Sequence, residues 1–251
     1  MSSSSTSRPA VARLLALVLA AAVFGSLVVA SVGVAAAQED QSDAEVRVIH
    51  AVPDAPAVDV YVDGELVFED VEFGEESEYQ SVPAGTQTVT VTPANDSETV
   101  VYEEELDVES GQATVAVGGE LAADGEDLVA VALPDDAEPG ENESAVRLAH
   151  LAPDAPAVDV TVAETGDVLF DDVEFGNATE YATVPPGEYE LEVRNATDDD
   201  DGEVVQTVNV TVEDGEAYTA VATGYLDTEE APVDEPFTVE VYQDRTNASD
   251  E

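Results

Sequence analysis

The sequence predicts an all-β protein in which two tandem immunoglobulin-like β-sandwich domains follow an N-terminal signal helix. Three observations lead to this prediction. A long motif that begins at Val46 returns at Val146. Valines alternate with polar residues at the two-residue period of a β-strand through both copies. The chain begins with a long apolar run that is free of acidic residues, which is typical of an export signal.

The repeat defines the domain organisation. The segment Val46–Val60 returns as Val146–Val160, and the eight residues Pro53–Val60 are identical to Pro153–Val160. The two copies also share later landmarks: Phe68–Gly74 with Phe170–Gly176, Tyr79 with Tyr181, Val82–Gly85 with Val184–Gly187, and Gly111–Gly118 with Gly215–Gly224. This spacing is too long for a solenoid unit, so we infer a duplicated domain. We expect repeats at 45–134 and 145–243, an acidic linker at 135–144 and a disordered tail at 244–251.

Strands are predicted from alternation and from turn residues. Val58, Val60 and Val62 lie on one face of the chain, and Asp63-Gly64 then supplies the residues of a tight hairpin turn. Proline and glycine interrupt such runs about every ten residues, and no mature segment keeps a helical period. About seven strands per copy indicate an immunoglobulin-like sandwich, although the cysteines and tryptophan of immunoglobulin domains are absent.

Both copies resemble one known family at the motif Arg-x-x-His-x-x-Pro-Asp-Ala-Pro-Ala-Val-Asp-Val and at the later Phe-Gly, Tyr and Pro-x-Gly landmarks. They are similar to the domain of unknown function catalogued as family 4397. Its members are typically secreted proteins of bacteria and archaea, and they often occur in tandem. The resemblance implies export and β structure. It implies no activity and no functional residues.

The first 37 residues are interpreted as a signal peptide. Arg8 and Arg13 are its only charges, and an apolar run leads to Ala35–Ala37, after which we expect cleavage. The arginines are not adjacent, so the general secretory route is favoured over twin-arginine export. The alternative is an uncleaved anchor, since such a run could span a bilayer. We therefore expect an extracellular or cell-surface protein that meets a membrane only through this segment.

The charge of the chain indicates a halophile. The sequence carries 58 acidic residues, all after Gln38, and has a formal net charge of −52 with no lysine. Such a chain repels itself unless molar salt shortens the Debye length to about 3 Å. The valine-rich runs argue against simple disorder, so we expect a folded haloarchaeal protein. The lack of clustered Lys and Arg excludes nucleic acid as a partner.

Asparagine gives a second sign of export. Each asparagine is followed two residues later by Ser or Thr with no intervening proline, as in N-glycosylation acceptors. The candidates are Asn95, Asn142, Asn177, Asn195, Asn209 and Asn247. Cysteine is absent, so the chain uses no disulfides.

The repeated motif carries the candidate site residues, whose role the sequence leaves open. They are His50, Asp54 and Asp59 in the first copy and His150, Asp154 and Asp159 in the second. A functional interpretation makes each histidine a ligand or an acid–base group beside these aspartates. The favoured structural interpretation has each imidazole bond the backbone of the Pro-Asp-Ala-Pro loop.

No metal or cofactor is expected from these residues. One histidine per domain without cysteine does not make the usual zinc site. Calcium is the more plausible ion, but the Asp198–Gly202 run fails the EF-hand pattern and is better explained as a solvated hairpin tip. Tyr79, Tyr181, Phe73 and Phe175 are expected to be core anchors rather than a sugar platform.

We expect no catalytic residues. Without lysine or cysteine the chain lacks Schiff-base and thiol catalysis, and it contains neither a Gly-x-Ser-x-Gly nor a Gly-x-Gly-x-x-Gly motif. The favoured function is a non-catalytic binding or structural module whose partner is a surface protein or polysaccharide. The alternatives are an extracellular polymer hydrolase with paired carboxylates and a calcium-dependent adhesion protein.

Overall fold

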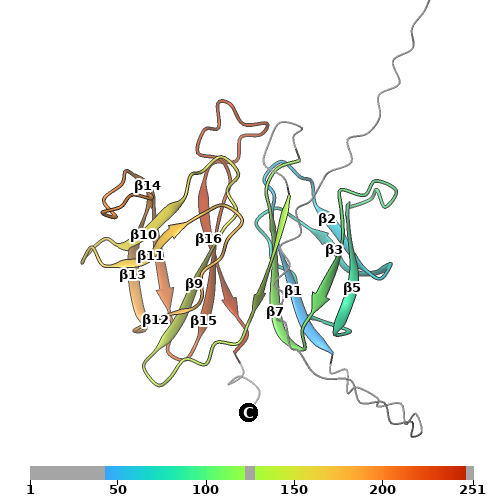
Figure 1. The fold of residues 1–251 in the computed structure, drawn as a ribbon, viewed down its shortest axis with the longest axis horizontal. Helices are drawn as coiled ribbons and strands as arrows, with labels where there is room; N and C mark the ends of the chain where they lie inside the picture. Colours follow the sequence, from blue (N-terminus) through green and yellow to red (C-terminus); the bar gives the residue numbers. More distant parts are fainter. Residues whose placement is uncertain (1–42, 122–127, 247–251) are drawn as a thin grey trace, which may run out of the picture. The chain divides into compact units, whose positions relative to one another are not determined.

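The computed structural model describes residues 43–121 and 128–246 and folds them entirely as strands, turns and loops (Figure 1). This confirms the all-β fold class. No helix within these two ranges is long and apolar enough to cross a membrane. The predicted signal peptide at 1–37, Asn247 and the last residues of the predicted tail lie outside the described residues.

Each repeat forms eight strands. The first repeat contains β1 (Ala44–Ala51), β2 (Val58–Val62), β3 (Glu65–Val71), β4 (Gln80–Val82), β5 (Gly85–Pro93), β6 (Tyr102–Val108), β7 (Gly111–Gly118) and β8 (Val129–Pro134). The second contains β9 (Ser144–His150), β10 (Val158–Val162), β11 (Val168–Val173), β12 (Ala182–Val184), β13 (Gly187–Asn195), β14 (Val204–Val212), β15 (Ala217–Thr223) and β16 (Thr238–Asp244).

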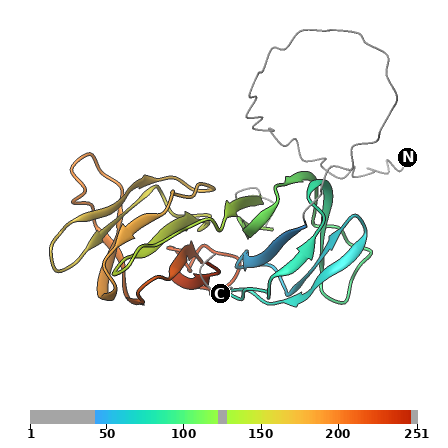
Figure 2. The ribbon, with the colours of Figure 1, turned by 90° about the horizontal axis from the view of Figure 1, so that it is seen from below.

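The strands of each repeat form two four-stranded sheets. In the first repeat the sheet orders are β4-β1-β7-β8 and β3-β2-β5-β6, and the second repeats them as β12-β9-β15-β16 and β11-β10-β13-β14. The pairs β1–β7 and β9–β15 are parallel, whereas every other described strand pair is antiparallel. In Figure 2 the blue β1 lies in one layer of the first repeat and the cyan strands lie in the other. The two predicted sandwich-like halves are therefore present.

Alternating valines fill the space between the two sheets of each repeat. In the first repeat Val46 and Val48 of β1 pack with Val58 and Val60 of β2 and with Phe68. The core of the second repeat contains the matching set from Leu148 to Phe237. Burying such side chains stabilises a fold by about 1.5–3 kcal/mol each. The alternation that predicts the strands therefore also selects the residues of the two cores.

The predicted hairpin at Asp63-Gly64 is confirmed. Both residues have positive φ angles, 49° and 80°, as a type I′ turn requires between antiparallel β2 and β3. The strand count of about seven per repeat falls one short of the eight observed. The runs β4 and β12 have three residues each, which is too short to show a period.

Two expectations about the ends of the repeats need correction. The predicted acidic linker at 135–144 is partly buried, because Asp135, Ala137 and Ser144 are enclosed and Ser144 already begins β9. The tail was expected to begin at Asp244, but this residue ends β16 and is only 2% exposed. Both aspartates are buried because arginines pair with them, a contact between residues too far apart in sequence to be predicted from local composition.

A third apolar cluster joins the two repeats. It contains equivalent positions from both: Ile49, Ala51, Ala116 and Leu133 from the first repeat, and Ala149, Leu151, Val221 and Tyr242 from the second. The described residues of both repeats accordingly belong to one compact unit. The exact domain boundaries stay a prediction.

Candidate functional site

The two histidines of the repeated motif are buried where the first strand of each repeat ends. The Nε2 atom of His50 lies 3.1 Å from the carbonyl oxygen of Pro56, and that of His150 lies 2.9 Å from Pro156 O. Both rings also meet a phenylalanine edge to face, Phe73 or Phe175. These are the loop contacts that the structural interpretation requires.

The histidine environment favours the neutral imidazole. Burial lowers the pKa of His50 and of His150, while the hydrogen bonds to the loop carbonyls act in the opposite direction. The backbone N–H of Val52 donates to His50 Nδ1 at 3.3 Å, so the ring carries its proton on Nε2. His50 therefore has both ring nitrogens occupied by its own loop.

The aspartates of the motif also bond backbone amides. Asp54 accepts a hydrogen bond from Leu121 N at 2.8 Å, and Asp154 accepts from the N–H groups of Leu226 and Asp227 at the same distance. Each side chain therefore ties its Pro-Asp-Ala-Pro loop to a distant loop. Asp54, Asp59 and His50 bond three different backbone groups, those of Leu121, Asp70 and Pro56 respectively.

The second motif aspartate supports a bulge in the neighbouring strand. Asp59 accepts from the N–H of Asp70 at 2.9 Å, and Asp159 accepts from that of Asp172 at 2.9 Å. Asp70 and Asp172 have positive φ angles of 56° and 50°, and the register of β2–β3 and β10–β11 shifts beside them. Asp159 also accepts from Thr197 N at 3.1 Å.

The site that the sequence analysis missed is centred on the first residue of the motif. Arg47 is 1% exposed and Arg147 is 3% exposed. Each Nε atom donates at 2.8 Å to a threonine of the same repeat, Thr114 or Thr219. The guanidinium of each also lies over a tyrosine ring of its own repeat, 5.2 Å from Tyr79 and 4.4 Å from Tyr181 respectively.

Each arginine pairs with a buried aspartate of the opposite repeat, and each also has a carboxylate of its own repeat nearby: Glu76 for Arg47, and Asp244 at 3.7 Å for Arg147. Arg47 pairs with Asp244 at the end of β16, and Arg147 pairs with Asp135 directly after β8. Each arginine also bonds the backbone of the opposite repeat. Arg47 Nη1 donates to Gln243 O at 2.9 Å, and Arg147 Nη1 donates to Pro134 O at 2.7 Å. We call these four side chains, Arg47, Asp244, Arg147 and Asp135, the exchanged ion pairs.

Tyrosines and threonines complete the hydrogen bonds of the buried carboxylates. Tyr79 donates to Asp135 at 2.8 Å, and Tyr181 donates to Asp244 at 2.6 Å. Burial, as the largest cause, raises the pKa of Tyr79 to about 12 and raises that of Tyr181 as well, so both hydroxyls stay protonated donors. The sequence did contain a signal for this network: two of the four arginines after Gln38 occupy the same motif position.

One group of carboxylates has a spacing that could hold a metal ion. Asp159, Asp171 and Asp200 offer oxygens that lie within 4.8 Å of one another. Partial desolvation and the neighbouring Asp171 and Asp159 raise the pKa of Asp200. Both oxygens of Asp159 already accept backbone hydrogen bonds. The Asp198–Gly202 run joins β13 to β14, which agrees with its interpretation as a hairpin tip.

The described glycosylation candidates differ in exposure. Asn95, Asn142, Asn177 and Asn209 are exposed, the first two with positive φ angles in turns. Asn195, at the end of β13, is partly buried, and its Oδ1 atom is enclosed without a hydrogen-bond partner. The first four are therefore more accessible as acceptors than Asn195.

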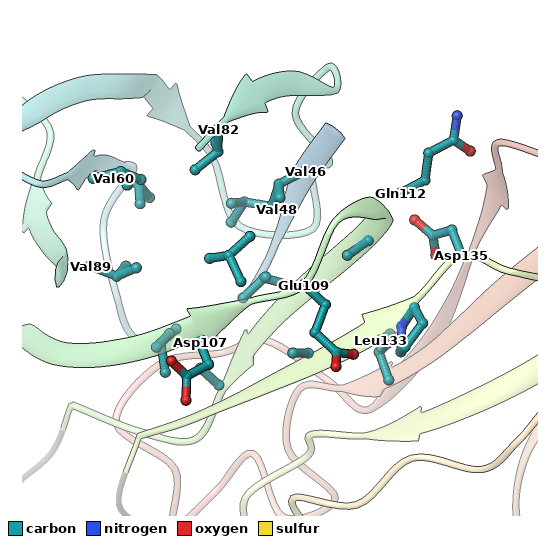
Figure 3. Close-up of a pocket in the computed structure, with 18 of the residues that line it drawn as sticks. Val46, Val48, Val60, Val82, Val89, Asp107, Glu109, Gln112, Leu133 and Asp135 are labelled. Atoms are coloured by element: carbon teal, nitrogen blue, oxygen red, sulfur yellow. The ribbon is translucent and has the colours of Figure 1, made fainter. Parts of the chain in front are cut away.

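The first repeat also encloses a large cavity between its sheets. Its volume is about 450 Å³, and apolar side chains from all the strands of the first repeat line most of it (Figure 3). The corresponding space in the second repeat measures about 50 Å³. Ligand pockets of proteins typically measure about 300–1,000 Å³, so only the first of these two cavities has the size of a ligand site.

Solved structures give weak similarities. A carbohydrate-binding module of family 26 from Eubacterium rectale Amy13K, determined with maltoheptaose, is 10% identical over 82% of this chain and 99% of its own, with a TM-score of 0.26. A candidate cell adhesion protein of Bacteroides fragilis is 8% identical over 82% of this chain and 98% of its own, with a TM-score of 0.21. Scores this low indicate neither a ligand nor a partner for this chain.

The comparison with protein families identifies the family of this chain. No curated protein matches the chain. The sequence profile described as "Domain of unknown function (DUF4397)" matches twice, over residues 44–161 and 144–250, which together span both sandwich-like repeats. This chain therefore belongs to the DUF4397 family and contains two tandem copies of its domain.

Proposed function

We propose that this chain is an exported, non-catalytic module of a haloarchaeal cell surface, in which two sandwiches act as one rigid body that binds or supports a surface protein or polysaccharide. The exchanged ion pairs are the observation that carries the proposal. Separating the repeats would break both exchanged ion pairs, and breaking one buried pair typically costs about 3–5 kcal/mol. The repeats are therefore held at a fixed spacing.

The environment of the motif residues supports a structural rather than a catalytic role. His50, His150, Asp54 and Asp154 use their polar atoms on loop backbone. A general acid or base would instead direct such an atom toward the substrate. The surface position of Asn95, Asn142, Asn177 and Asn209 supports export and glycosylation.

Export and glycosylation can be tested together on the native protein. Mass spectrometry of the protein from the cell envelope should find an N-terminus that begins at Gln38. Glycans should occupy exposed acceptors such as Asn142 and Asn209 but leave Asn195 unmodified. A cytoplasmic protein with an intact N-terminus and no glycans would contradict the proposal.

The salt requirement has its own test. Circular dichroism should show β structure in molar salt and lose it on dilution, because the carboxylates repel one another over a longer Debye length at low salt. Potassium chloride and sodium chloride at matched concentration should act alike. An unchanged spectrum in dilute buffer would contradict the proposed adaptation to salt.

The partner and the competing activities are distinguished by affinity purification from the envelope in molar salt. A reproducible surface protein or polysaccharide partner that survives chelation of divalent ions supports the module. Release of sugars from envelope polymer would indicate the hydrolase instead. Capture or thermal stabilisation that needs micromolar calcium at constant ionic strength would indicate the adhesion protein.

A further inference from the structure

We propose that the first repeat binds the hydrocarbon chain of a cationic amphiphile, in its simplest form a primary alkylamine, in the cavity between its two sheets. This rests on the proposed function, because it names a ligand class for the binding module. Three observations carry the proposal: the size and apolar lining of the cavity, its loss in the second repeat, and the charge at one end.

The cavity is large enough for a chain-like ligand. Its volume of about 450 Å³ is roughly three times the 150 Å³ of an engineered apolar cavity that binds benzene. Val46, Val60, Val82 and Val89 approach it from four different strands, β1, β2, β4 and β5 (Figure 3). A lining of this kind recognises hydrocarbon and offers little to a sugar.

The second repeat shows that this fold does not require the cavity. Strand register makes Tyr218 of the second repeat equivalent to Ala113 of the first. Tyr218 pairs with Val146, and Ala113 pairs with the equivalent valine, Val46. It also places Tyr189 at the position of Gln87. Tyr218 and Tyr189 line the remaining space of about 50 Å³ in the second repeat.

Smaller substitutions in the edge strands β8 and β16 also reduce the cavity in the second repeat. Val239 and Val241 of β16 occupy the positions of Ala130 and Ala132 of β8. Atoms that line an empty cavity lose van der Waals partners on one side, so an unfilled cavity is costly. The duplicated domain closes this cavity in one copy and keeps it in the other, which is expected if the open copy holds a ligand.

The charge at one end of the cavity selects the head group. The polar lining comes from the end of β6, the turn into β7 and the residues after β8, where Asp107, Glu109 and Asp136 are exposed. The lining contains no arginine. Figure 3 shows Asp107 and Glu109 across the cavity from the labelled valines. An anionic head group would be repelled here, whereas an ammonium group gains charge-assisted hydrogen bonds.

The test is calorimetric titration of the full mature chain with decylamine in molar salt, below the concentration at which the amine forms micelles. We expect one site per chain. Decanoate should bind at least about tenfold more weakly because of the acidic end. Shortening the amine should weaken binding by about threefold to fourfold per methylene. Equal binding of decanoate, or affinity independent of chain length, would overturn the proposal.

Variants assign the site to this cavity. Ala113→Tyr copies the residue of the second repeat and should abolish the site, with melting temperature unchanged or higher. Ala130→Val with Ala132→Val makes the same test with smaller side chains that β16 already carries. Tyr218→Ala, the reciprocal control, should retain the site in the first repeat. Undiminished binding by both filled variants, or no binding by the wild type, would overturn the proposal.

The outcome is separable from that of the proposed function. Ala113→Tyr should still be exported, glycosylated and captured with its surface partner if only the amphiphile site is lost. A wild-type chain that binds decylamine but remains in the cytoplasm would instead refute the surface role alone.

Discussion

Single residues explain why the motif recurs in both repeats. Its arginine enters an exchanged ion pair, its histidine bonds a loop carbonyl, and its two aspartates bond amides of a neighbouring loop and strand. The sequence could identify these positions because they are identical in both copies. It could not show that Asp244 and Asp135 are buried, because the arginines that pair with them belong to the opposite repeat.

Replacing Asp135 tests the exchanged ion pairs. Asp135→Asn should lower the free energy of unfolding by about 3 kcal/mol, because it removes the carboxylate that pairs directly with buried Arg147 and leaves only the more distant Asp244, 3.7 Å away. Asp136→Asn is a matched control, since the neighbouring carboxylate is exposed. Urea unfolding at constant molar salt measures both. Equal, small effects would mean that the pair contributes little.

The two histidines predict a pH dependence of stability. Burial lowers their pKa in the folded state below the unfolded value of about 6.5, so unfolding takes up protons. Stability that is fully present above this value should be lost as pH falls from about 7.5 to 5.5. His50→Gln with His150→Gln should flatten the melting temperature across this window. A slope that persists in the double variant would assign it to carboxylates.

At the scale of strands, local pattern predicted much of the fold. The alternating valines located β2, and Asp63-Gly64 located the hairpin turn between β2 and β3. Alternation carries no information about which strands pair, so the parallel β1–β7 and β9–β15 pairs could not be predicted. The bulge beside Asp70 was also missed, because an aspartate with positive φ has no distinctive neighbours in sequence.

The bulges predict that the two motif aspartates, Asp59 and Asp159, contribute unequally to stability. Asp159→Ala should destabilise more than Asp59→Ala, because Asp159 accepts from two amides, those of Asp172 and Thr197, whereas Asp59 accepts from that of Asp70. Each unpaired buried amide costs about 1–3 kcal/mol. Paired thermal melts of the two variants in molar salt measure the difference. The opposite order would contradict this assignment.

At the scale of the whole molecule, the two repeats meet through unequal partners. A Cβ atom at Gly118 would lie 2.5 Å from Leu151 Cβ. At the equivalent crossing Thr223 instead donates a hydrogen bond at 2.9 Å to the carbonyl of Ala51. In the first contact the small residue, Gly118, belongs to the first repeat at the end of β7, and the large one, Leu151, to the second. In the second contact the residue at the end of β15, Thr223, is the larger one, and it meets the small Ala51. This reversal appears only once the two copies are seen in contact.

This crossing can be tested by exchange. Gly118→Thr should destabilise by about 1–3 kcal/mol through overpacking against Leu151. Adding Leu151→Ala recreates the pairing of Thr223 with Ala51 and should restore part of the loss. A double-mutant cycle from urea unfolding gives the coupling. Strictly additive effects would show that the two positions do not meet.

The reversed sizes at these crossings mean that the two domains have ceased to be interchangeable. Two copies of the first would place Ala51 opposite Gly118 and leave a void, whereas two copies of the second would force Leu151 against Thr223. Neither repeat would therefore pack well against a second copy of itself. The contact between the repeats is therefore asymmetric, and neither repeat could take the place of the other in it.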